Sequence, residues 1–210
     1  MERLRVHRGE KLIYEKGDLT LSSVGDRAVV IVTNGCLFVE NSIGDGARIT
    51  TIPPCTDGSR MIVDFCAASV KEENPHHLIV RGTIGHDVIL QAHGNIELHR
   101  SVGNGLIATA RDKFIAHLVG EGAEISADIV DIGKLGSGHI QALHKAVILD
   151  MGEGSEAHIK EGSYHGEKTG INCYISAEKI FIEAPHPTSR LYARQKVTTA
   201  TTRKDKPATR

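Results

Sequence analysis

The chain has 210 residues and a formal net charge of −1, with 40% hydrophobic residues, 4% aromatic residues and no Trp. This length allows one domain with an aliphatic core, and the near-neutral charge excludes a whole-protein field that attracts nucleic acid or membranes. No apolar run approaches the ~18 residues of a membrane span. The charged start at residues 1–5 lacks the apolar segment of a signal peptide. We therefore expect a cytoplasmic protein without a transmembrane segment, with signal-less export left open.

Residues 1–35 contain short β-type runs that Gly-Asp pairs separate, such as Gly17-Asp18 and Gly25-Asp26. Gly and Asp in these places are turn residues. A stack of coils needs a covered end, because its first coil would otherwise present an unpaired strand edge. We predict that residues 1–35 form an N-terminal cap and irregular first coils.

From residue 36 the chain repeats, because an aliphatic residue followed by Gly returns at intervals of 18, 17, 16 and 16 residues. The repeated pairs are Ile84-Gly85, Val102-Gly103, Val119-Gly120, Leu135-Gly136 and Met151-Gly152, with an earlier copy at Ile43-Gly44. Apolar residues three, five and seven places after each Gly give a period of two, which indicates strands. After Gly136 the pattern slips by one residue, so Ile140 and Ala142 take the inward positions.

The repeat predicts an all-β fold, a single-stranded parallel β-helix with coils of about 17 residues at positions 36–187. Coils stacked about 4.8 Å apart give each backbone N–H and C=O a partner in the next coil. We expect Gly at the corners because the chain turns there through φ values that other residues avoid. The handedness is predicted as right-handed. The alternative is a left-handed hexapeptide helix, whose motif would have to recur three times per coil.

Residues 52–75 interrupt the repeat and are predicted to be an insertion, because their removal restores the coil spacing. Two thiols and two imidazoles lie in or beside this segment and form a candidate zinc site: Cys55, Cys66, His76 and His77. Two thiolates and two imidazoles suit tetrahedral zinc, although the usual close Cys pair is missing. The alternative is two ordinary thiols and a polar loop end. No other cofactor is expected.

Residues 188–210 are rich in Lys, Arg and Thr and are predicted to be a basic, disordered tail. Such a tail suits an acidic surface, and the candidate contact residues are Arg190, Arg194, Lys196, Arg203, Lys204 and Lys206. The alternative is a tail that only adds solubility.

A second candidate site follows from the coil register. Eight places after the corner Gly, successive coils carry His93, Arg111, Asp128, His144 and Lys160. Stacking would place Asp128 beside His144, and an Asp–His pair is suited to acid–base catalysis. The alternative is a solvated ladder of compensating charges, in which each pair contributes only ~0.3 kcal/mol to stability.

The pattern aliphatic-Gly-x-Gly-x-x-Ile-x-Ala resembles the β-helical repeats of the bactofilins and of flagellar-assembly protein A-like, polymer-forming families. It is carried by residues 43–49, 119–127 and 151–154 and extends over about residues 36–182. The resemblance implies a right-handed parallel β-helix with a scaffolding or assembly role, and it concerns the style of the repeat.

The sequence therefore favours a non-enzymatic scaffold or interaction protein that binds a protein partner or its own copies. One alternative is a carbohydrate-active enzyme or carbohydrate-binding β-helix, which the shortage of aromatic residues disfavours. The other is a left-handed hexapeptide-type acyltransferase, which would form a trimer with a His in a cleft between subunits.

Overall fold

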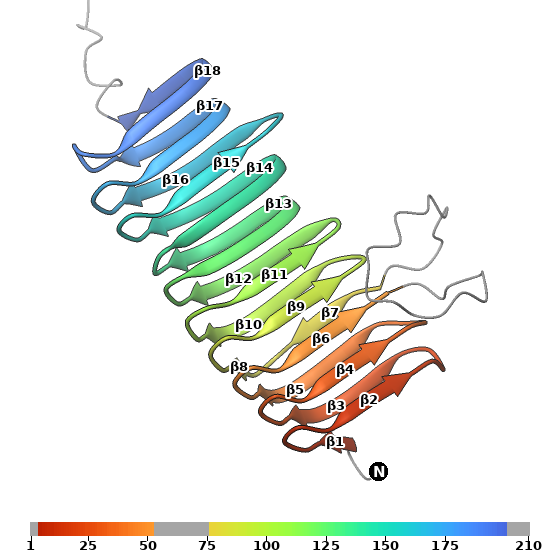
Figure 1. Cartoon of the computed structure of the whole chain (residues 1–210). Coiled ribbons are helices and arrows are strands. Elements are labelled where there is room, and N and C mark those ends of the chain that lie inside the picture. Colours follow the sequence, from red (N-terminus) through yellow and green to blue (C-terminus); the bar gives the residue numbers. More distant parts are fainter. Residues whose placement is uncertain (1–3, 53–75, 201–210) are drawn as a thin grey trace, which may run out of the picture.

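The computed structural model describes residues 4–52 and 76–200 of the chain. In these ranges the strands stack in parallel into a β-solenoid of about 10 turns, with coils of ~18 residues (Figure 1). The coils follow one another in chain order, so β1 and β18 lie at opposite ends of the stack. The predicted all-β parallel β-helix is confirmed.

Two columns of strands run along the solenoid. We call the outer surface of the column that begins with β1 the first face, and that of the column that begins with β2 the second face. The first face contains β1 (Leu4–Val6), β3 (Leu19–Val24), β5 (Leu37–Ile43), β7 (Leu78–Val80), β8 (Thr83–Ile84), β10 (Ile96–Val102), β12 (Lys113–Val119) and β16 (Ser163–Thr169).

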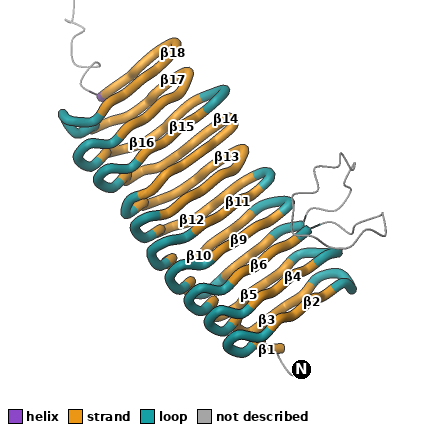
Figure 2. The backbone as a smooth tube through the Cα atoms, viewed as in Figure 1, coloured by secondary structure: helices purple, strands orange, loops and turns teal. Residues whose placement is uncertain are grey.

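The second face is formed by shorter strands. They are β2 (Lys11–Tyr14), β4 (Val29–Val32), β6 (Arg48–Thr51), β9 (Ile89–Ala92), β11 (Ile107–Ala110) and β15 (Glu156–Ile159). Four long strands belong to both faces, because the N-terminal part of each lies in the second face and the C-terminal part in the first face. They are β13 (Ala123–Leu135), β14 (Gly138–Met151), β17 (Tyr174–Ala184) and β18 (Arg190–Thr199). Figure 2 shows the turns gathered along the edges between these strands.

The aliphatic column predicted from the repeat is present. Ile84 pairs with Val102, and the same register continues through Val119, Leu135 and Met151. All of these side chains are at most 4% exposed. The slip after Gly136 is also confirmed, because Ile140 and Ala142 pair with Ile125 and Ala127.

Large and small residues alternate within the core to keep its width constant. Phe114 is followed two residues later by Ala116, and Tyr164 is followed two residues later by Gly166. A Cβ on Gly166 would lie 2.8 Å from the Tyr164 ring, so Gly166 makes room for the tyrosine. The Tyr164 hydroxyl donates to the carbonyl of Ile148 at 3.2 Å, and burial raises the pKa of this phenol. The core thus accepts an occasional ring where a small residue lies next to it.

The two glycines of a Gly-x-Gly corner have different roles. The second one adopts a positive φ, for example +69° at Gly122 and +65° at Gly154, which agrees with the expected left-handed turn. The first one has no positive φ. A Cβ on Gly120 would lie 2.7 Å from the carbonyl oxygen of Gly103, which stacks directly beneath it. The first glycine is therefore required by close contact between coils, and the sequence-based explanation was wrong for it.

Residues 1–35 are not a separate cap in the described part of the chain. Leu19 pairs with Leu37 and Val29 with Arg48, so these residues form regular coils from β1 onward. Their inward side chains, including Leu21 and Val24, are buried in the same columns as those of later coils. The repeat motif is incomplete here, because the corner after Val6 carries His7 where later corners carry the first glycine.

Residues 190–199 are not a disordered tail, which corrects the prediction for 188–210. They form β18, whose residues pair with β17 from Tyr174↔Arg190 to Ile182↔Thr199. Leu191 and Ala193 pack against the core, while Arg190, Arg194 and Lys196 are exposed. The basic residues occupy the outward positions of this strand. The many charges in the segment therefore concealed the alternation of inward apolar and outward polar residues. Residues 201–210 lie outside the described ranges.

The predicted insertion at 52–75 lies, apart from Ile52, outside the described residues. Its flanks support the spacing argument, because Leu37 pairs with Leu78 across the gap and the backbone N–H of Ile52 still donates to the carbonyl of Val32.

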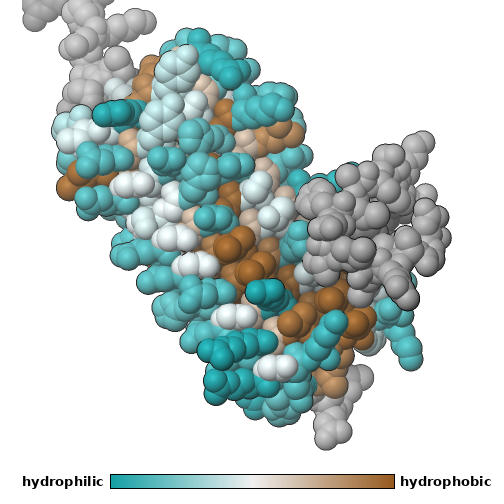
Figure 3. Space-filling view, in the orientation of Figure 1, coloured by the Kyte–Doolittle hydropathy of each residue, from teal (hydrophilic) through white to brown (hydrophobic). Residues whose placement is uncertain are grey.

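No helix in the described ranges has the length and apolar character needed to cross a membrane. Figure 3 shows a largely polar surface with apolar patches toward the N-terminal half.

Candidate functional site

The predicted Asp128–His144 pair is formed. The imidazole Nδ1 of His144 lies 3.9 Å from a carboxylate oxygen of Asp128, and the two side chains are 54% and 44% exposed. On the two preceding coils, Arg111 lies 3.3 Å from the imidazole of His93. The coil register therefore brings these residues together as expected. Their catalytic role stays a prediction, and their exposure is typical of a weak surface ion pair.

The imidazoles of the predicted zinc site make hydrogen bonds with the backbone. The Nδ1 atom of the buried His76 lies 3.2 Å from the amide nitrogen of Gly35, and the Nδ1 atom of His77 accepts the amide of Asn95 at 2.9 Å. These bonds give both rings a structural role at a corner of the solenoid. Cys55 and Cys66 lie outside the described residues, so this zinc site stays a prediction.

Two cysteines lie within the described residues, Cys36 and Cys173, and both carry a titratable thiol. Cys173 is 1% exposed and donates to the carbonyl oxygen of Gly152 at 3.0 Å. Burial raises the pKa of both thiols above the ordinary value of 9.0. Both therefore remain protonated at neutral pH, whereas a reactive cysteine needs a lowered pKa.

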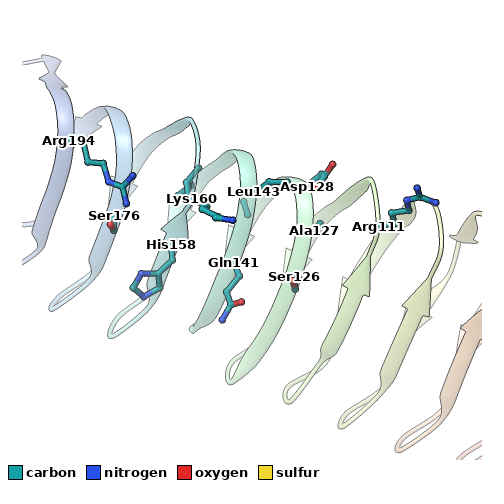
Figure 4. A pocket seen from close by; sticks show the side chains of 12 residues that line it. Arg111, Ser126, Ala127, Asp128, Gln141, Leu143, His158, Lys160, Ser176 and Arg194 are labelled. Atoms are coloured by element: carbon teal, nitrogen blue, oxygen red, sulfur yellow. The ribbon is translucent and has the colours of Figure 1, made fainter. Parts of the chain in front are cut away.

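A groove runs along the second face and has a volume of about 470 Å³. Its polar lining comes from side chains on successive coils (Figure 4): Arg111, Ser126, Asp128, Gln141, His158, Lys160, Ser176 and Arg194. These residues extend from the coil of β11 to that of β18, which is six coils and about 24 Å at the spacing of paired strands. The groove thus follows the solenoid axis.

A cluster that the sequence interpretation missed overlaps this groove, because His158 belongs to both. His139 on β14 contacts Glu156 on the next coil, with 3.3 Å between Nδ1 and the carboxylate oxygen. The same oxygen lies 3.6 Å from Nε2 of His158. Gln141 lies 3.0 Å from the other ring nitrogen of His139, and the ring of Tyr174 lies 5.3 Å from that of His158.

A signal for this cluster was present in the sequence. The slip after Gly136, which the sequence itself shows, places His139 outward beside the inward Ile140. With the slip applied, His139 falls beside Glu156, and His158 follows on the same face two residues later.

Comparison of the chain with protein-family models, with curated proteins and with solved structures gave no match. The bactofilin and flagellar-assembly protein A resemblance is therefore supported only as an arrangement of stacked coils.

Proposed function

We propose that this protein is a non-enzymatic scaffold that holds an extended, acidic polypeptide segment along the groove of its second face. The observation that carries the proposal is the course of the groove across six coils, from Arg111 to Arg194. A rigid surface of this kind suits partners that lie along it as an extended chain.

The dimensions of the groove support a chain-like occupant. A volume of about 470 Å³ over about 24 Å of length corresponds to a mean cross-section of about 20 Å². This is narrow enough for one polypeptide chain partly sunk into the surface. The length accommodates about seven residues of an extended strand, at 3.3–3.4 Å per residue.

The polar groups along the groove support an acidic occupant. Three cationic side chains, Arg111, Lys160 and Arg194, line it, against the single carboxylate of Asp128. Between them lie hydroxyl and amide groups that can bond to a peptide backbone, including Ser126 and Gln141. Complementary charge mainly raises the association rate and the selectivity for the partner.

The proposal is tested with a decaglutamate peptide as the probe, by fluorescence anisotropy at low and moderate salt. We expect binding that weakens with salt and is lost in the charge-reversal variant Lys160→Glu/Arg194→Glu. The matched control is Lys134→Glu/Lys179→Glu, which reverses two exposed charges on the first face and is expected to bind like the unmodified protein. Decalysine is the control peptide and should not bind.

Equal loss of binding in both double variants would contradict the groove as the binding site, because the net charge of the protein would then explain the affinity. An acidic oligogalacturonide of matched length is the second probe. If it binds more tightly than decaglutamate, the carbohydrate-binding alternative replaces the polypeptide proposal.

We also propose, from the resemblance to polymer-forming repeats, that copies stack end to end. Within the described residues, β18 pairs only with β17 and β2 only with β4, so each end offers a strand edge. Continuing the register would place Leu191 of one copy over Leu12 of the next, and both are only partly buried in the single chain. It would also place Arg190 over Lys11, and like charges at such an edge oppose stacking.

Light scattering over a series of salt concentrations tests this second proposal. Salt screens the Arg190–Lys11 repulsion, so we expect the unmodified chain to form larger assemblies at high salt. The Arg190→Glu variant lacks this repulsion and should form them at low salt as well. A mass that stays at 22.7 kDa in all of these conditions contradicts it.

A further inference from the structure

We propose that His139, Glu156 and His158 bind one zinc ion on the second face. The three residues form the one group of at least three His, Cys, Asp or Glu side chains within residues 4–52 and 76–200 whose ligand atoms lie mutually within 4.8 Å. The proposal does not depend on the groove partner.

The backbone holds these side chains in fixed relative positions. His139 and Glu156 are directly opposite one another in the β14–β15 pair, and His158 follows Glu156 by two residues on the same surface. Between them, the inward residues Ile140 and Ala157 pair with each other and are fully buried. The ligands therefore project from rigid, paired strands, and little ordering is needed when a metal binds.

The distances already approach those of a tetrahedral zinc site. Zinc bonds of about 2.0–2.2 Å to nitrogen and oxygen imply ligand–ligand distances of about 3.3–3.6 Å in a tetrahedron. The carboxylate oxygen of Glu156 lies 3.3 Å from Nδ1 of His139 and 3.6 Å from Nε2 of His158. The remaining distance between the two imidazoles is within 4.8 Å and closes by a small rotation of the rings.

Neighbouring side chains are placed as the supporting shell of a metal site. The amide nitrogen of Gln141 lies 3.0 Å from Nε2 of His139. With the amide group turned by 180°, its oxygen would accept the proton of that nitrogen while Nδ1 faces the metal. Tyr174 packs against His158 with ring centroids 5.3 Å apart. Glu124, opposite His139 on the preceding coil, adds a second negative charge that favours a cation.

The ligand types identify the class of metal. Two imidazoles and one carboxylate prefer zinc and neighbouring transition metals over Mg²⁺ and Ca²⁺, which take mainly oxygen ligands. Three protein ligands leave a fourth position, and the exposure of the side chains, 39%, 53% and 42%, places it toward solvent. A water molecule or a donor atom of a partner can occupy that position.

The test is calorimetric titration of the metal-stripped full chain with Zn²⁺. We expect one equivalent to bind, with affinity about 10-fold or more weaker in His139→Ala and in His158→Ala, and about 10-fold weaker in Gln141→Ala. The matched control is His144→Ala, which removes another exposed imidazole of β14, between its two paired segments, and should bind zinc normally. Zinc should also raise the Tm of the unmodified chain more than that of His158→Ala at the same zinc concentration.

A second measurement separates this site from the cysteine candidates. Co²⁺ in place of zinc should give the visible absorption of a tetrahedral site without a thiolate charge-transfer band, and the Cys55→Ser/Cys66→Ser variant should give the same spectrum. A thiolate band that this variant removes, or zinc affinity that His139→Ala and His158→Ala leave unchanged, would overturn the proposal.

Discussion

The carboxylate of Asp45 accepts a hydrogen bond from the backbone N–H of His86 at 2.7 Å, although 41 residues separate the two in sequence. The same relationship recurs along the corner. Asp26 accepts from the amide of Asp45, and the imidazole of His86 accepts from the amide of Asn104 at 3.0 Å. At four successive corners the residue after the first glycine thus binds the backbone of the next coil, in a place where a corner amide would otherwise depend on water.

This ladder predicts that Asp45→Ala destabilises the fold by about 1 kcal/mol or more, because a charged acceptor is lost from a backbone amide. Asp45→Asn keeps an acceptor oxygen and should cost less. Urea unfolding followed by circular dichroism measures both. Glu121→Ala is the control, since within the described residues this side chain makes no hydrogen bond to the next coil. Equal stability of Asp45→Ala and the unmodified chain would refute the ladder as a source of stability.

The stacked corners predict a large loss of stability for substitution of one glycine of a corner and a small loss for substitution of the other. A Cβ on Gly152 would collide with the carbonyl oxygen of Gly136, whereas a Cβ on Gly154 meets nothing within 4 Å. Gly152→Ala should therefore cost about 2 kcal/mol through overpacking. Gly154→Asn should cost less than about 0.5 kcal/mol, because the equivalent positions of other corners hold Asp87 and Asn172, both at φ 54°. Thermal unfolding measures the stability of the two variants. A larger loss of stability for Gly154→Asn than for Gly152→Ala would contradict the stacked geometry of the corner.

Spacing alone predicted the columns of the solenoid, because one coil length places equivalent residues above one another. Ile84, Val102 and Val119 stack as the repeat required, and this register also placed Asp128 beside His144. The spacing could not distinguish the two corner glycines, since steric contact between coils appears only when the coils are stacked. For the first glycine the decisive neighbour is the backbone of the coil beneath it.

Where prediction failed, local composition concealed the alternation of the strand. The charges of Arg190 and Arg194 hid the inward Leu191 between them. The slip that turns His139 outward was visible in the sequence, but the position of Glu156 beside it follows only from the stacked register. The contact of His139 with Glu156 depends on that slip and on a coil length of 17 residues at this place.

The pKa of His165 predicts a loss of stability in acid. Partial burial and, secondarily, the nearby Lys145 charge lower this pKa below the ordinary value of 6.5. The ring stacks on Phe181 with centroids 4.7 Å apart, and its Nε2 lies 3.0 Å from the Ser163 hydroxyl. Because the folded state disfavours the proton, the stabilising contribution is complete above pH 6.5 and is lost as the pH falls through the lowered folded-state value.

We expect His165→Phe to unfold at a urea concentration that changes less between pH 7.5 and pH 5 than that of the unmodified chain. His99→Gln, which removes an imidazole whose side chain is 54% exposed, serves as the control and should keep the original pH dependence. Parallel pH profiles for His165→Phe and the unmodified chain would show that His165 does not contribute.

The last coil predicts different effects for two adjacent residues of β18. Leu191 packs against the core, whereas Tyr192 is 61% exposed on the second face. Leu191→Asp should lower the free energy of unfolding by about 1–2 kcal/mol, because an apolar contact is lost and a carboxylate is brought toward the core. Tyr192→Asp adds the same charge to the same basic strand and should change it by less than about 0.5 kcal/mol. Urea unfolding compares the two variants, and equal effects would mean that residues 190–199 do not form a packed coil in solution.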